Sequence, residues 1–471
     1  MTATAPARTD HRLGFTTLDR EVSLDRLPLS GELPAWLQGS LVRTGPAAFE
    51  AGGPPLRHWF DGLAMLHAFS FADGQVAYAN RWLHSDAWKQ ARRGEMSLGE
   101  FGTDPCRSIF RRAMSMFSPG ATDNGNVNVT RLGDRFLAMT ETPMPIEFDP
   151  RTLETIGHAP VASRGDGQLT TAHPHLDHRN GALLNYIARF SRTSTYRLYA
   201  RRADEAKRRV LASIKTRRPS YMHSFGMTER HAVLVEFPLV VDPLRLAFGG
   251  RPFIENYRWE PERGTRIHLV PLDGGEPLGP YVTEPFFCFH HINAYEHDGN
   301  VLVDMCTYED SSIIDALYLD PLRAGGALPD NRPRRLTVPL RGGTVRSEQL
   351  GDTNLELPRI NYRRHNGRPY RYVWGVRADG SWLDGIVKLD VETGDLATWS
   401  EDGVYPGEPV FVPAPSEKAE DDGVLLSVIL DADRGTSSLL VLDAETLAER
   451  ARAEVPHHIP HGFHGQYFGG L

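Results

Sequence analysis

The chain has few cysteines and no long apolar run, and both absences narrow what it can be. Its three cysteines, Cys106, Cys288 and Cys306, are scattered and odd in number, so they indicate neither a disulfide framework nor a paired-cysteine metal site. No segment approaches the roughly 20 consecutive apolar residues of a membrane-crossing helix. The first dozen residues also lack the apolar segment of a signal peptide. A cytoplasmic protein is therefore expected.

Basic residues are also fewer than acidic ones. The 60 acidic residues outnumber the 52 basic ones and give a net charge of −8, which argues against nucleic acid as a partner. With 24% charged and 40% hydrophobic residues, the composition is that of a globular enzyme or binding protein. We expect a disordered tail over residues 1–13 and a single domain over 14–471.

Turn signals are abundant, and they predict an all-β fold. Apolar, strand-like runs recur beside Asn-Gly or Asp-Gly turns, which are the strongest short signal for a β-hairpin. The clearest examples are FADGQVAYAN, HRNGALLNYI, EHDGNVLVDM, ADGSWLDGIVKL and EDDGVLLSVIL. A β-propeller accommodates so many short strands, whereas a single sandwich does not. No repeat with a fixed motif is present, which argues against a WD40 or kelch propeller.

Few segments have helical spacing. Two candidates are residues 85–101 and 318–326, and the third is 106–117, CRSIFRRAMSMF, whose apolar residues recur at helical intervals. This third segment fits a core-facing helix or a helix that dips into lipid at the mouth of a site, and both interpretations remain open. A second apolar stretch, 237–250, could add to the same patch.

Four of the nineteen histidines lie in apolar or glycine-flanked surroundings that suit a buried ligand: His173, His223, His290 and His464. In FFCFHHINAYE, residues 286–296, the adjacent His290 and His291 must face opposite sides of a strand. A buried imidazole needs a hydrogen-bond partner or a metal. The four are too far apart for zinc-finger or HExxH spacing, but blades of a propeller can bring distant residues to one axis. Ordinary structural histidines remain the alternative.

Three isolated glutamates could support such a site: Glu141 in FLAMTETPMP, Glu356 in TNLELPRINY and Glu408 in YPGEPVFV. Metal-bound imidazoles usually donate their second N–H to a carboxylate. Each glutamate lies at or beside an apolar strand, where a surface position at the strand end is the simpler explanation for any one of them.

Taken together, these motifs resemble the carotenoid cleavage oxygenases, the family that also contains the retinal-pigment-epithelium isomerohydrolase, and the chain looks like a bacterial-type member. The resemblance covers residues 14–466. It is carried by LPAWLQGSLVRTGP, HWFDGLAMLHAF, EFGTDPCRSIF, AMTETPMPIEFDPRTLETIG, TAHPHLD, SYMHSFGMTE, FHHINAYE, ELPRINYRRHNGRPYRYVWG, YPGEPVFV and RAEVPHHIPHGFHG.

The resemblance implies a seven-bladed β-propeller with a small helical and loop cap over one Fe(II) ion per chain on the propeller axis. The implied catalytic metal ligands are His173, His223, His290 and His464. Glu141, Glu356 and Glu408 are implied as partners of His223, His290 and His464 respectively. His291 and His175 are expected to point away from the metal. Four neutral imidazoles would leave two positions of an octahedral ion open.

The implied reaction inserts oxygen from O2 across one conjugated C=C bond of a carotenoid or apocarotenoid and releases aldehyde or ketone fragments, such as retinal-type apocarotenals. So apolar a substrate needs an aromatic tunnel. The resemblance implies that Phe60, Phe101, Thr140, Tyr308 and Phe463 line it, although core packing explains each residue equally well. A membrane-derived substrate would suit peripheral contact with the inner membrane through 109–117 and 237–250. No protein partner is indicated.

Two other functions remain open. Some members of the family cleave stilbenes, and a short, polar-ended tunnel would favour that reaction. A non-catalytic propeller that binds carotenoid or stores metal is the alternative from another class. SYMHSFGMTE and RPYRYVWG look more like the animal branch of the family. The stretch from Ile313 to Ala316 departs from the isomerohydrolase pattern, which argues against isomerase activity.

Overall fold

A computed structural model of the chain describes residues 10–50, 55–95, 101–103, 122–160, 166–205, 207–248, 251–378 and 382–471. The segment 106–117, which begins with Cys106, lies outside these residues, so both interpretations of it stay predictions.

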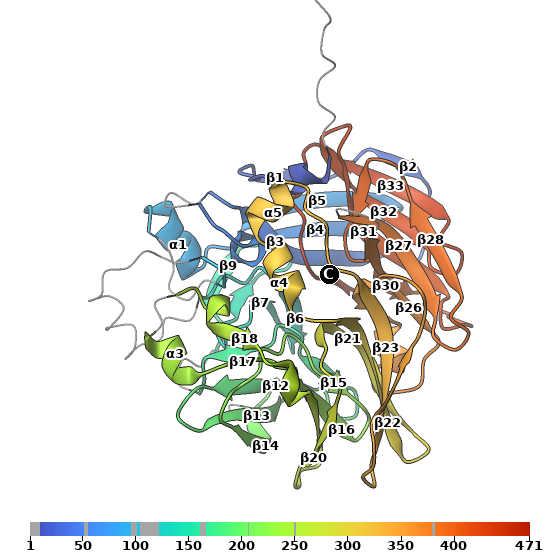
Figure 1. The fold of residues 1–471 in the computed structure, drawn as a ribbon. Helices are drawn as coiled ribbons and strands as arrows, with labels where there is room; N and C mark the ends of the chain where they lie inside the picture. Colours follow the sequence, from blue (N-terminus) through green and yellow to red (C-terminus); the bar gives the residue numbers. More distant parts are fainter. Residues whose placement is uncertain are drawn as a thin grey trace, which may run out of the picture.

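Seven sheets of four to six antiparallel strands are arranged around one axis, so the predicted seven-bladed β-propeller is confirmed (Figure 1). The first blade contains β1 (Val22–Leu24), β5 (Gln75–Trp82), β4 (Leu63–Ala72), β3 (Gly39–Ala48) and β34 (Gly465–Phe468). The second contains β6 (Asn128–Leu132), β7 (Arg135–Met139), β8 (Ile146–Phe148) and β9 (Thr155–His158). The third contains β10 (Leu169–Thr170), β11 (His175–Asp177), β12 (Ala182–Arg189), β13 (Ser194–Arg201) and β14 (Arg209–Thr216).

The remaining four blades follow in chain order. The fourth contains β15 (Gly226–Met227), β16 (His231–Glu236), β19 (Thr265–Pro271) and β20 (Leu278–Thr283). The fifth contains β21 (Phe287–His297), β22 (Asn300–Tyr308), β23 (Asn331–Pro339) and β24 (Arg346–Gln349). The sixth contains β25 (Glu356–Arg359), β26 (Tyr372–Ala378), β27 (Leu383–Asp390) and β28 (Leu396–Ser400). The seventh contains β29 (Val404–Pro406), β30 (Val410–Pro413), β31 (Gly423–Asp431), β32 (Thr436–Asp443), β33 (Glu449–Val455) and β2 (Leu29–Gly31).

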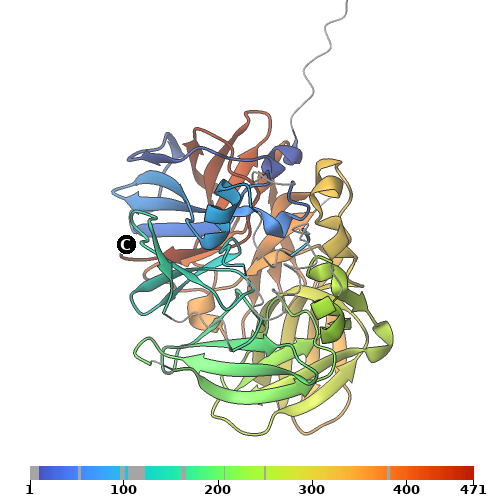
Figure 2. The same ribbon diagram turned by 90° about the vertical axis from the view of Figure 1, so that its left-hand side faces the viewer.

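The two ends of the chain close the ring between the first and seventh blades. Near the N-terminus, β2 pairs with β33 of the seventh blade, while the C-terminal β34 pairs with β3 of the first. Both views show N-terminal blue strands beside C-terminal red ones (Figures 1 and 2). Thus β2, from the N-terminal part of the chain, completes the seventh blade, and the C-terminal β34 completes the first.

Two of the Asx-Gly turns illustrate hairpins formed where the sequence predicts them. Asp73 and Gly74 connect β4 to β5 with φ of 50° and 71°, and Asp298 and Gly299 connect β21 to β22 with φ of 47° and 74°. Two consecutive residues with positive φ are what a two-residue hairpin turn of the favoured hand requires. Aspartate and glycine tolerate this region better than other residues, so these local signals fix where the strands reverse.

Short helices lie outside the blades, and some of them form a cap on one face of the propeller (Figures 1 and 2). The α-helices are α1 (Asp86–Arg92), α3 (Pro243–Phe248), α4 (Ser312–Ala316), α5 (Leu319–Arg323) and α6 (Tyr362–His365). The 3-10 helices are η1 (His11–Phe15), η2 (Trp59–Asp61), η3 (Ile254–Asn256) and η4 (Pro261–Arg263), and a ribbon pairs β17 (Leu239–Val241) with β18 (Tyr257–Trp259). Buried residues of η2, η3, α4 and α5 share one apolar cluster with the aromatic end of β21. The helices predicted within 85–101 and 318–326 are α1 and α5.

Two sequence expectations need correction. His11–Leu13, assigned to a disordered tail, belong to η1, and His11 is only 4% exposed because its ring stacks on Trp382. In the apolar stretch 237–250, Phe237 and Leu239–Val241 are buried in the core, so they cannot form a surface patch. Leu244 on α3 is exposed.

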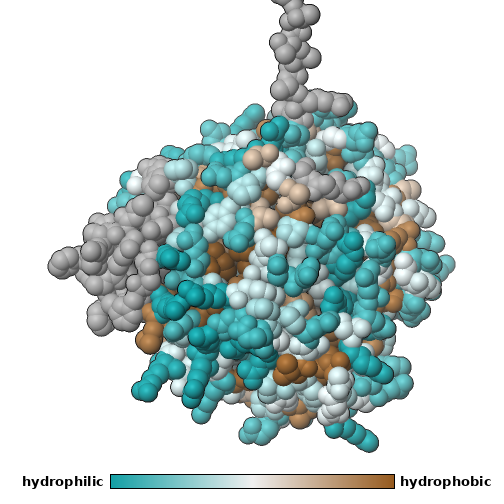
Figure 3. Space-filling view, in the orientation of Figure 1, coloured by the Kyte–Doolittle hydropathy of each residue, from teal (hydrophilic) through white to brown (hydrophobic). Residues whose placement is uncertain are grey.

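Within the described part of the chain, no helix is long and apolar enough to cross a membrane. The face seen in Figure 3 is mostly polar, with apolar side chains visible between polar ones near its middle.

Candidate metal centre

The four histidines singled out from the sequence come together at the centre of the propeller. One side-chain nitrogen from each of His173, His223, His290 and His464 lies within 4.8 Å of the others, a group that could hold a metal ion. The Nε2 atoms of His173 and His223 are 3.0 Å apart, and those of His290 and His464 are 3.2 Å apart. His223, His290 and His464 are buried, and His173 is half-buried.

Each histidine is brought in by a different blade. His173 lies between β10 and β11, His223 lies just before β15, His290 is on β21, and His464 immediately precedes β34. Edge strands of neighbouring blades contact one another here, with β21 touching β15 and β25, and β34 touching β30 and β6. Residues far apart in sequence therefore meet because the ring of blades brings these edges to one place.

Three glutamates fix the orientation of three of the imidazoles. His223 Nδ1 donates to Glu141 at 2.6 Å, and His290 Nδ1 donates to Glu356 at 2.5 Å. His464 Nδ1 donates to Glu408 at 2.7 Å. A carboxylate only accepts, so the proton lies on Nδ1 and the Nε2 lone pair is left for the centre.

These glutamates come from the three blades that supply no histidine. Glu141 follows β7 of the second blade, Glu356 begins β25 of the sixth, and Glu408 lies between β29 and β30 of the seventh. Every blade thus contributes one member of a seven-residue group.

A second donor holds each glutamate. The hydroxyl of Tyr221 donates to Glu141 at 2.9 Å, and that of Tyr308 donates to Glu356 at 2.9 Å. Glu408 instead accepts from Arg359 Nη2 and from the backbone N–H of Gly465, both at 2.9 Å. Burial raises the pKa of Glu408, but the charges of Arg359 and His464 outweigh burial and lower that pKa to about 2. This carboxylate is therefore ionised at neutral pH.

Burial favours the neutral form of two of the histidines, His173 and His464. It lowers the pKa of His464 to about 4, although Glu408 acts in the opposite direction. Burial, together with the three other histidines of the group, also holds the pKa of His173 well below its usual range. A neutral imidazole has a free lone pair, which is the form that binds a metal.

The neighbouring histidines of the two paired motifs have other partners. His291 Nδ1 lies 2.8 Å from the Ser224 hydroxyl. His175 Nε2 donates to the Phe225 carbonyl at 2.8 Å. The structure places both outside the four-histidine group.

Aromatic rings cover one side of the centre. Of the residues expected to bind substrate, Phe60 lies 6.3 Å from the His223 ring, and its ring is 5.1 Å from both Phe101 and Phe463. Tyr308 is buried in the same apolar cluster, with its hydroxyl bound to Glu356. The half-buried Thr140 lies between β7 and Glu141.

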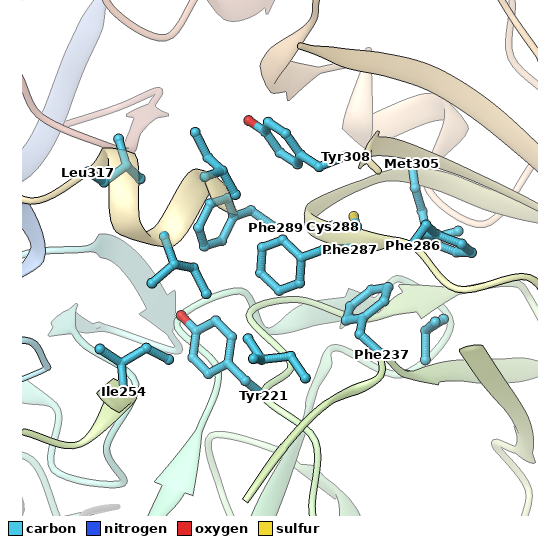
Figure 4. Close-up of a cluster of buried hydrophobic side chains, with 14 of the residues drawn as sticks. Tyr221, Phe237, Ile254, Phe286, Phe287, Cys288, Phe289, Met305, Tyr308 and Leu317 are labelled. Atoms are coloured by element: carbon cyan, nitrogen blue, oxygen red, sulfur yellow. The ribbon is translucent and has the colours of Figure 1, made fainter. Parts of the chain in front are cut away.

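The sequence reasoning missed three residues here. Phe289 lies 5.4 Å from the His223 ring and 5.8 Å from Phe60, among the rings shown in Figure 4. Its place in the run FFCFHH, two residues after Phe287 on the same strand face, could have indicated this. Tyr221 and Arg359 hold glutamates that are remote in sequence, so no local signal indicates their roles.

A second group of possible ligands, Asp86, Asp123 and His158, was not predicted. Asp123 accepts from the backbone N–H groups of Asp86 and Ala87 and binds His158 at 3.0 Å. Its oxygens therefore cap the start of α1, which accounts for its burial.

Comparison with known proteins places this centre in a family. Residues 15–469 match the sequence profile described as retinal pigment epithelial membrane protein. The chain is 36% identical to a carotenoid isomerooxygenase of Galleria mellonella, over 93% of this chain and 92% of that one. It is also 36% identical to the β,β-carotene 15,15′-dioxygenase of Mus musculus, over 93% of this chain and 88% of that one.

Solved structures give the same result. The cobalt-substituted apocarotenoid oxygenase of Synechocystis superposes with a TM-score of 0.87 at 30% identity, covering 97% of this chain and 98% of that one. With a profile match over nearly its whole length and relatives of this identity, the chain belongs to the retinal pigment epithelial membrane protein family, the carotenoid cleavage oxygenases whose motifs its sequence carries.

Proposed function

We propose that the protein is a non-haem Fe(II) oxygenase that cleaves a conjugated C=C bond of a carotenoid or apocarotenoid with O2. The observation that carries this proposal is the group of four histidines held by three buried or half-buried glutamates. The products are two carbonyl fragments, and both oxygen atoms enter them if the enzyme acts as a dioxygenase.

The donor set fits one ferrous ion per chain, with His173, His223, His290 and His464 as ligands. Two imidazole nitrogens about 2.1 Å from one ion and at right angles to each other lie about 3 Å apart. This matches the separations of 3.0 and 3.2 Å between the paired Nε2 atoms. Structural zinc is usually closed by a tetrahedron that includes cysteine, and catalytic zinc has three protein ligands. Four neutral histidines suit neither.

When bound, ferrous iron would supply the activation that triplet O2 needs before it reacts with a closed-shell alkene. The protein residues do the remaining work. Glu141, Glu356 and Glu408 hold the imidazoles in one tautomer and offset part of the ion's charge. The aromatic rings of Phe60, Phe101 and Phe463, with Tyr308 and Thr140, bind the polyene beside the histidines and exclude water from it.

The proposed catalytic unit is the whole of residues 14–471, because ligands and glutamates come from all seven blades. We place it in the cytoplasm, in peripheral contact with the inner membrane from which it draws its substrate. The described cysteines, Cys288 and Cys306, are both buried and free, as expected in a reducing compartment.

Aerobic incubation of the iron-loaded protein with β-carotene, an apocarotenal and resveratrol should yield carbonyl fragments from one of the first two, identified by mass spectrometry. The fragment masses fix the cleaved bond, and 18O2 labelling counts the oxygen atoms incorporated. Cleavage of resveratrol alone would instead indicate a stilbene-cleaving enzyme. Iron binding with no cleavage of any substrate would indicate a non-catalytic propeller.

His464→Ala should abolish iron binding, because three histidines without a carboxylate make a poor Fe(II) site. Iron per chain, measured by mass spectrometry after desalting, should fall from near one to near zero. His291→Ala is the matched control and should retain iron, since its ring contacts Ser224 rather than the centre. Full iron retention in His464→Ala would remove His464 from the ligand set.

Glu408→Gln should lower iron affinity or activity by about 10–100-fold. The neutral amide lacks the negative charge of the carboxylate that accepts hydrogen bonds from His464 and Arg359. The control is Glu236→Gln, which alters a buried pair of the same kind: Glu236 lies 2.7 Å from His268 in the fourth blade. Equal losses of iron affinity or activity in the two variants would mean that Glu408→Gln acts by destabilising the fold rather than by weakening the metal site.

The wild-type protein should float with phosphatidylethanolamine–phosphatidylglycerol vesicles if residues 109–117 and the exposed part of 237–250 contact lipid. Leu244 on α3 is 63% exposed, so Leu244→Glu should lower the bound fraction several-fold. Leu396→Glu changes another exposed leucine, on β28, and should bind like the wild type. Failure of the wild-type protein to float would exclude membrane contact.

A further inference from the structure

Arg43 is a buried cation whose guanidinium lacks a partner among the described residues. It lies on β3 in the first blade and is 6% exposed. Across the described part of the chain, its side chain makes neither a hydrogen bond nor an ion pair. Burying a charge without a partner is strongly unfavourable, so such a group needs an explanation.

The nearby carboxylate, Glu408, is already engaged. Its charge acts on Arg43, but its oxygens bind the imidazole of His464, the guanidinium of Arg359 and the N–H of Gly465. Glu408 thus lies near two guanidinium groups but pairs with that of Arg359, so the charge of Arg43 has no directly bound counter-ion among the described residues.

A small cavity adjoins Arg43. Its lining includes Arg43, Gly407, His461, Gly462, Trp382 and Tyr405. The two glycines leave room beside the guanidinium, since a Cβ at Gly462 would lie 2.9 Å from Nη2 and one at Gly407 would lie 3.5 Å from Nη1. The volume open to the centre of a water-sized sphere is about 10 Å³, close to what one small species needs.

Trp382, which lines the cavity, and His11, which stacks on Trp382, each have a buried side-chain nitrogen without a partner among the described residues. These nitrogens are Trp382 Nε1 and His11 Nε2, and the two rings stack 6.3 Å apart. His461 cannot act as a counter-ion, because an imidazole carries no negative charge, and its Nε2 donates to the His11 carbonyl at 3.0 Å.

We propose that this cavity binds one small monovalent anion of halide size, chloride in the cell, against the guanidinium of Arg43. The anion supplies the negative charge that Arg43 lacks, and the cavity is too small for a phosphate or an organic carboxylate. The site lies between the first and seventh blades, beside the strands that close the ring, so the bound anion strengthens that closure.

Crystals of the iron-loaded wild-type protein soaked in sodium bromide should show an anomalous peak within contact distance of the Arg43 guanidinium. In parallel, thermal unfolding is compared in bromide and in gluconate at equal ionic strength, because gluconate does not fit the cavity. Bromide should raise the wild-type midpoint by about 1–3 °C. Neither readout uses catalysis, so the result is independent of the proposed oxygenase activity.

Arg43→Met removes the charge at similar side-chain length and should abolish both the peak and the bromide-dependent shift. Arg209→Met changes an exposed arginine and should keep both. Ordered water with no anomalous signal would overturn the proposal, and so would a bromide-dependent shift that persists in Arg43→Met. A peak without any shift would mean an adventitious ion only. If Arg43→Met does not fold, the proposal is tested on the wild-type protein alone, by the anomalous peak beside Arg43 and by the bromide-dependent change in the unfolding midpoint.

Discussion

Three short imidazole–carboxylate hydrogen bonds give the centre its shape, and much of the fold serves to make them possible. Buried or half-buried carboxylates are unfavourable unless they are paired, and each of these three pairs with a histidine on one side and with a tyrosine or arginine on the other. The chain Tyr221–Glu141–His223 shows the principle, because removing Glu141 takes the acceptor away from both the buried hydroxyl and the buried imidazole N–H. The histidines are thus oriented before any metal binds.

Such a group needs a closed ring. Each blade contributes one histidine or one glutamate, so opening the ring at any point would separate members of the group. The closure is made twice, by β2 on β33 and by β34 on β3. His464 directly precedes β34, and the final strand therefore both closes the propeller and positions one of the four imidazoles.

The two sides of the centre differ in chemistry. Phe60 and Phe289 lie against His223, within the apolar cluster that continues into the cap helices. On the side of His464, Glu408 lies between Arg359 and the buried Arg43. The first side therefore offers an apolar surface, whereas the second carries buried guanidinium charge, which an apolar group would leave without polar partners.

Local signals in the sequence determine the strand reversals, because Asp73-Gly74 and Asp298-Gly299 adopt turn conformations that few other residue pairs tolerate. They also determine the all-β class, and the motifs identify the family. They do not determine which groups meet at the axis. The contact of Phe289 with His223 and the pairing of Arg359 with Glu408 each join residues from different blades. The lack of a counter-ion for Arg43 likewise results from how its neighbours in other blades are placed. Such contacts depend on how the sheets pack and where the ring closes, and no short stretch of sequence encodes either. The same holds for η1, since His11 stacks on Trp382, which directly precedes β27 of the sixth blade.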